Sequence, residues 1–99
     1  MAEYVNLNKC RSFNFTVGGA LEPFVDQVCS EVIIVNRTGL PVNIKDNNYF
    51  DDANAFLLED DESVTIRGVT NSNQVSAICP SGSGPIYYRT QFYSSNPSR

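Results

Sequence analysis

The chain has 99 residues, which is room for one domain, and 41% of them are apolar, as in ordinary folded proteins. Its net charge is −4 and its seven basic residues are scattered, so we expect no nucleic-acid partner, because phosphate binding needs a cationic surface. The chain has no histidine, the side chain best suited to acid–base chemistry near neutral pH and the commonest metal ligand. These features favour a binding or structural protein over an enzyme.

The N-terminal part differs from the rest of the chain. Residues 12–17 alternate between polar and apolar side chains as one short strand, and Gly18-Gly19 and Pro23 interrupt the chain after it. We therefore expect residues 1–27 to form an extended N-terminal arm or an edge strand. Phe13, Phe15 and Phe24 need an apolar surface, supplied either by their own domain or by a neighbouring subunit.

The predicted β body begins near residue 28. Residues 31–36 are a run rich in β-branched side chains, which predicts a strand covered on both faces. A turn at 37–39 leads into residues 40–45, and the two segments together predict a hairpin. A polar loop then precedes residues 55–58, which form either a short strand or a single helical turn.

Turn signals continue to recur about every ten residues, a spacing typical of sandwiches and barrels. They separate predicted strands at 63–69, 74–79 and 86–93, and residues 94–99 form a polar tail. The prediction is an all-β fold, a single compact β-sandwich or jelly-roll-like barrel with an extended N-terminal arm. Its parts are the arm or edge strand at 1–27, the sandwich body at 28–93 and the tail at 94–99.

Alternate residues of the last predicted strand fall on opposite faces. Ile86, Tyr88, Thr90 and Phe92 share one face, and Tyr87, Arg89, Gln91 and Tyr93 share the other. If the first face packs into the core, the second presents tyrosine and arginine, the residues enriched at the centres of protein interfaces. The same tyrosines could instead stack on sugar rings or pair within an ordinary exposed sheet.

The three cysteines and the lack of targeting signals concern the protein's environment. Cys10, Cys29 and Cys79 cannot all pair within one chain and match no metal-binding spacing, so Cys29 and Cys79 are expected to be buried free thiols. No secretory leader and no membrane-spanning stretch is evident. We therefore expect a protein made in the cytosol, without membrane contact, and treat the sequons at Asn14 and Asn36 as chance matches.

Reactive groups are sparse. The acidic residues could supply calcium ligands, but their spacing does not match a helix–loop–helix calcium site, and solvated loop acids are the expectation. A nucleophile would lack a base other than Lys9 or Lys45, both in polar surroundings, and residues 82–84 do not form a phosphate-binding loop. No catalytic residue, metal ligand or cofactor is predicted.

Three segments carry a resemblance to a known group of proteins: EVIIVNRTGLPV at 31–42, LEDDESVTI at 58–66 and GPIYYR at 84–89. They resemble small β-rich virion proteins of tailed bacteriophages, which decorate capsids or complete tails. In that group a Pro-Gly or Ala-Gly turn is more familiar where this chain has Asp60-Asp61.

The resemblance implies a non-enzymatic structural virion protein, most simply a capsid decoration (cement) protein that binds and stabilises the phage head. A tail or baseplate accessory protein and a host-glycan-binding attachment module are the alternatives. The implied partners are the major capsid protein or tail proteins, and a homo-oligomer assembled in the host cytoplasm into the virion is expected. The predicted contact residues are Tyr87, Arg89 and Tyr93, together with Phe13 and Phe15 of the arm.

Overall fold

The computed structural model describes residues 10–46 and 56–92. All but one of its named elements are strands, and the exception is a 3₁₀ turn, η3. The elements in chain order are β1 (Arg11–Val17), β2 (Glu22–Pro23), β3 (Glu31–Asn36), β4 (Val42–Asp46), β5 (Phe56–Leu58), β6 (Ser63–Arg67), η3 (Ser72–Gln74), β7 (Val75–Ile78) and β8 (Gly84–Gln91).

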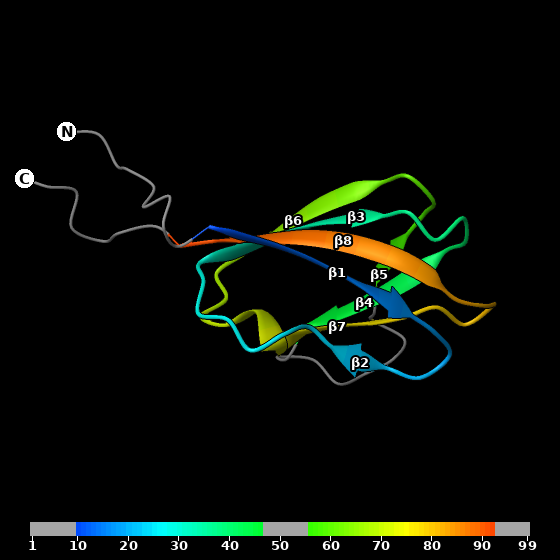
Figure 1. The fold of residues 1–99 in the computed structure, drawn as a ribbon, viewed down its shortest axis with the longest axis horizontal. Helices are drawn as coiled ribbons and strands as arrows, with labels where there is room; N and C mark the ends of the chain where they lie inside the picture. Colours follow the sequence, from blue (N-terminus) through cyan, green and yellow to red (C-terminus); the bar gives the residue numbers. More distant parts are fainter. Residues whose placement is uncertain (1–9, 47–55, 93–99) are drawn as a thin grey trace, which may run out of the picture.

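The strands form two four-stranded antiparallel sheets, in the orders β1-β8-β3-β6 and β2-β7-β4-β5 (Figure 1). Four strand pairs are nested along the chain, and from the innermost to the outermost they are β4–β5, β3–β6, β2–β7 and β1–β8. Pairing of β8 with β3 and of β7 with β4 completes the two sheets. This is a jelly roll, in which one long folded hairpin wraps into two facing sheets. The predicted all-β sandwich or jelly-roll architecture is confirmed.

The core lies between the two sheets and is contributed by the inward-facing residues of both. Alternation in β8 agrees with the prediction, since Ile86, Tyr88 and Thr90 are buried while Tyr87 and Arg89 are exposed. Cys29 and Cys79 are buried free thiols, as predicted. The buried apolar residues are Val17, Phe24, Cys29, Val32, Ile34, Val42, Ile44, Leu58, Val75, Ala77, Cys79, Ile86 and Tyr88.

The hairpin predicted from residues 31–36 and 40–45 is wrong. β3 pairs with β6 and β8, whereas β4 pairs with β5 and β7 in the other sheet. The turn between them contains Gly39 in the left-handed region, at φ 84°, and carries the chain from one sheet to the other. A local turn signal is compatible with either connection, and burial of the next strand in the second sheet decides between them. Residues 56–58 take the strand alternative.

β1 and β2 are edge strands, one in each sheet. The aromatic rings of this segment pack on their own domain: Phe13 stacks on Tyr88 at a centroid distance of 5.2 Å, and Phe24 stacks on the same ring at 4.2 Å. Phe15 meets both Phe24 and Tyr88 edge-on. The apolar surface that these rings need is therefore supplied by their own domain, which is one of the two alternatives predicted.

The prediction that β3 is covered on both faces is also wrong for the residues described. Val32 and Ile34 point into the core with no exposed surface, but Ile33 and Val35 on the opposite face are only half-buried. No described element lies over that opposite face. The β-branched run that suggested a doubly covered strand therefore leaves two aliphatic side chains on an open sheet surface.

Candidate functional site

The open side of the β1-β8-β3-β6 sheet carries the candidate site. Val35 of β3 lies directly opposite Tyr87 of β8, and Ile33 lies opposite Arg89. Tyr87 is 47% exposed, Arg89 is exposed, and the two aliphatic side chains are half-buried. We call the outward side chains of Ile33, Val35, Tyr87 and Arg89 the outer face.

Two shallow hollows lie along the outer face. One, with a volume of about 250 Å³, is lined mainly by Ile33, Val35, Tyr87 and Arg89, with β1 closing its side. The other, of about 520 Å³, is lined by Val35, Arg37, Pro85 and Tyr87. Both open widely to solvent, so they are suited to receiving side chains from a partner surface rather than to enclosing a small molecule.

The charges on this side of the sheet are unevenly balanced. Arg37 bonds Asp61 at 2.9 Å, and Arg67 bonds the buried carboxylate of Glu31 at 3.2 Å. Within residues 10–46 and 56–92, Arg89 makes no ion pair. The outer face thus combines an aliphatic and aromatic strip with one uncompensated cation.

The predicted contact residues do not all lie together. Tyr87 and Arg89 lie side by side on the outer face, as the alternation of β8 indicated. Phe13 and Phe15 instead face Tyr88 on the inner side of the sheet. Tyr93 lies outside the described residues.

Ile33 and Val35 are the outer-face residues that the sequence prediction missed. The alternation along β3 could have indicated them, because the even-numbered residues of the strand fill the core and the odd-numbered Ile33 and Val35 must then point the other way. The missing information was the pairing register with β8, which places Val35 beside Tyr87. That register depends on two segments about fifty residues apart and has no local signature.

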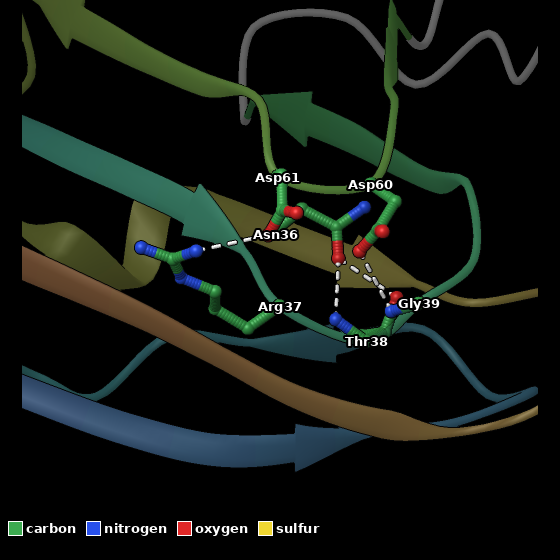
Figure 2. A network of polar contacts seen from close by, with 6 residues as sticks. All are labelled: Asn36, Arg37, Thr38, Gly39, Asp60 and Asp61. Carbon is green, nitrogen blue, oxygen red and sulfur yellow. Dashed lines mark hydrogen bonds and ion pairs between the residues drawn. The ribbon is translucent and has the colours of Figure 1, made fainter.

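Apart from the outer face, a cluster of polar contacts stabilises the turn between β3 and β4 (Figure 2). The fully buried Asn36 side chain donates to the carbonyl oxygens of Leu40 and Leu58 at 2.7 and 2.9 Å and accepts from the backbone N–H of Thr38 at 2.9 Å. The backbone N–H of Gly39 donates to Asp60 at 2.9 Å. These bonds join β3 to the β5–β6 turn.

The same contacts bear on the acidic turn considered as a calcium site. Asp60 accepts from Gly39, Asp61 accepts from Arg37, and Glu62 accepts from the backbone N–H of Glu59 at 2.8 Å. Each of these three carboxylates therefore has a structural partner. No group of three or more potential metal ligands occurs among the residues that the structure describes. Asp51 and Asp52 lie outside them.

The burial of Asn36 also bears on whether its sequon can be glycosylated. With no exposed surface and its amide engaged in four hydrogen bonds, it is closed to a modifying enzyme in the folded chain. Asn14, in the other sequon, is exposed on β1. In the described part of the chain, no helix is long and apolar enough to cross a membrane.

Comparisons with known proteins identify the fold but not a family. No protein-family model and no curated protein sequence matches the chain. A cupin superfamily protein from Desulfitobacterium hafniense is similar in structure, with a TM-score of 0.59 and 10% identity over 92% of this chain and 76% of that one. A cupin-2 domain protein from Shewanella frigidimarina gives 0.54 and 13% over 91% and 79%.

A de novo designed double-stranded β-helix is also similar, with a TM-score of 0.52 and 16% identity over 85% of this chain and 99% of that one. At such identities the likeness concerns the fold alone. It agrees with the jelly-roll order of the two sheets.

Proposed function

We propose that this chain is a non-enzymatic structural protein that docks onto a partner protein through its outer face. The observation that carries the proposal is the pairing of Val35 with Tyr87 and of Ile33 with Arg89 on a sheet surface that no described element covers. A strand with aliphatic side chains on both faces is expected to be covered on both. A partner surface would supply the missing cover.

The chemistry of the face favours a protein as that partner. Tyrosine and arginine contribute much of the binding energy of protein interfaces, because each buries a large area and still makes directed hydrogen bonds. Arg89 lies beside apolar side chains and has no ion pair in the described residues, so the complementary surface should present a carboxylate next to aliphatic or aromatic groups.

The resemblance of three sequence segments to phage virion proteins supports a specific setting. In that setting the chain decorates the phage head as a cement protein, and the partner is the major capsid protein. Many copies at the high local density of a virion would stabilise the shell by burying interface area, since any ligand that binds only the intact state stabilises it. A place on the tail or baseplate would use the same face on a different partner.

The test uses particles of the phage that encodes the chain. Particles carrying Tyr87→Ala or Arg89→Glu are compared with wild type for copies of the chain per tail-free head and for the temperature at which DNA-filled heads rupture. Both variants are expected to lose most of the bound copies, because truncating an interface hot spot costs about 2 kcal/mol or more, roughly 30-fold in affinity. Rupture should then occur at a lower temperature.

Leu57→Ala is the matched control, because Leu57 is 51% exposed but belongs to β5 in the other sheet. It should leave occupancy and rupture temperature unchanged. Absence of the chain from tail-free heads would reject the capsid role, and its recovery on purified tails would assign it there. Full occupancy of heads by both outer-face variants would reject the docking face.

A further inference from the structure

The edge of the β1-β8-β3-β6 sheet formed by β6 has an open hydrogen-bonding side. The backbone N–H of Asn36 bonds the carbonyl of Glu62, and that of Gly68 bonds the carbonyl of Ser30, so the even-numbered residues of this segment face β3. The backbone groups of Ser63, Thr65 and Arg67 therefore point away from β3. No described strand pairs with them, and β6 forms the rim of its sheet in Figure 1.

β6 lacks most of the features that usually protect a sheet edge, and its one charged side chain is Arg67 at its end. Its five residues include no proline and no lysine, and its pairing with β3 is continuous, without a bulge. The edges of the other sheet are protected by their shortness, because β2 has two residues, one of them Pro23, and β5 has three. Val64 and Ile66 on the inner side of β6 remain half-buried and would gain burial from a further strand.

The charges at the two ends of β6 are opposite. Asp60, Asp61 and Glu62 precede the strand and are exposed, while Arg67 ends it with a side chain that is 80% exposed. An antiparallel copy of the same strand would place its arginine beside the acidic turn, and the relation would repeat on the other side of the two-fold axis. A parallel copy would bring like charges together.

We propose that two copies of this chain pair through β6, antiparallel and centred on Thr65, to form one continuous eight-stranded sheet. Thr65 then faces Thr65 of the second copy, Ser63 faces Arg67, and Val64 faces Ile66. Three of these pairs are formed by Ser63, Thr65 and Arg67, whose backbone groups point away from β3. In each of the three, the two residues exchange two backbone hydrogen bonds. The single Nε–Oε1 bond to Glu31 leaves other guanidinium donors of Arg67 available for the second copy's Asp61.

This pairing has a consequence for the docking face. A two-fold axis perpendicular to a sheet leaves the outer faces of both copies on the same side. Their two Tyr87–Arg89 strips would engage a partner array together, and the second contact would form at a raised effective concentration. The dimer itself does not depend on the proposed docking function, because it concerns the purified chain alone.

The test is the mass of the full-length purified chain in solution, measured by sedimentation equilibrium across concentrations up to the millimolar range. The wild type is expected to rise from 11.0 kDa towards twice that mass as concentration increases. Thr65→Pro should remain at the monomer mass, because proline removes the outward N–H and is tolerated where an edge N–H faces solvent.

Asn14→Pro is the matched control. Asn14 is exposed on β1, the opposite edge of the same sheet, and pairs with Tyr87, whose own backbone bonds are directed to β3. This control should dimerise like wild type. A wild type that stays at the monomer mass throughout would overturn the proposal, and so would a dimer lost in Asn14→Pro but kept in Thr65→Pro.

A cross-link gives a readout that is independent of proline tolerance. In a Cys10→Ser background, which removes the one cysteine that is not fully buried, Thr65→Cys should yield a disulfide-linked dimer on mild oxidation. Thr16→Cys, exposed on β1, should yield far less. Equal yields from the two positions would contradict pairing through β6.

Discussion

Asn36, which has no exposed surface, donates from Nδ2 to the carbonyl oxygen of Leu58 at 2.9 Å and so ties β3 in one sheet to β5 in the other. A second bond from the same nitrogen reaches the carbonyl of Leu40 at 2.7 Å. One amide thus holds together the sheet-to-sheet turn and the edge of the opposite layer.

Replacing this amide should be among the most destabilising polar substitutions in the chain. Asn36→Ala removes the bonds from the amide to the carbonyls of Leu40 and Leu58 and leaves the N–H of Thr38 without its acceptor, and we expect a loss of about 2–4 kcal/mol in the free energy of unfolding. Urea denaturation checks it. Asn14→Ala, at an exposed strand position, should change stability by no more than about 0.5 kcal/mol, and a comparable loss there would show that Asn36 has no special role.

Among the non-glycine residues that the structure describes, Asp61 is the one whose backbone lies in the left-handed region, at φ 65°. Asp61→Gly should be more stable than Asp61→Ala by about 1 kcal/mol in thermal or urea unfolding, because both lose the Arg37 ion pair but only glycine relieves the strain. That pair is more than half exposed and contributes little by itself. Equal stability of the two variants would contradict a strained turn.

Gly84 makes a close approach that its alanine variant cannot keep. A Cβ there would lie 2.8 Å from the Cα and 2.9 Å from the carbonyl oxygen of Thr38, so backbone must move to admit it. Gly84→Ala should lose about 1–3 kcal/mol of stability, as over-packed sites do. Gly19→Ala, where no atom lies within 4 Å, should be close to neutral, and a similar loss at both sites would count against the packing explanation.

Tyr88 links the aromatic cluster to the backbone and should give stability a dependence on alkaline pH. Burial raises the pKa of its hydroxyl above the ordinary 10.0, against the smaller lowering effect of the hydrogen bond from the N–H of Val25. Its contribution is therefore fully present below about pH 10, the unfolded value, and is lost as the pH rises through the higher folded value.

Tyr88→Phe should remove that part of the alkaline loss and, at neutral pH, lower stability by about 1–2 kcal/mol because the N–H of Val25 loses its acceptor. Unfolding measured from pH 7 to 11 in both proteins checks it. Burial also raises the pKa of the Cys29 thiol, so the difference between the two curves is the relevant quantity. Parallel curves would contradict the assignment to Tyr88.

The sequence predicted the fold class and the two faces of β8 well, because alternation and recurring turns are local signals. It could not distinguish a hairpin from a sheet-to-sheet crossing after Asn36, since both need the same turn residues. The positive φ at Asp61 favours glycine, yet this chain has an aspartate there, which pairs with Arg37. At Asp61 the interactions with the β3–β4 turn outweigh the local preference for glycine.

The candidate site was only half predictable. Tyr87 and Arg89 are adjacent on one strand face and could be found from alternation alone. Ile33 and Val35 looked like interior residues, because β-branched runs usually occur in covered strands. Only the register between β3 and β8 shows that these aliphatic side chains extend the Tyr87 surface.

The most direct test of the docking face is hydroxyl-radical footprinting of the chain, free and bound in purified particles of the phage on which we propose that it docks. Tyr87 on the outer face and Leu57 on the other sheet are similarly exposed in the free chain, at 47% and 51%. If the outer face docks, oxidation of Tyr87 should fall sharply in the particle while that of Leu57 stays the same. Unchanged oxidation of Tyr87 in the particle-bound chain would contradict the proposal.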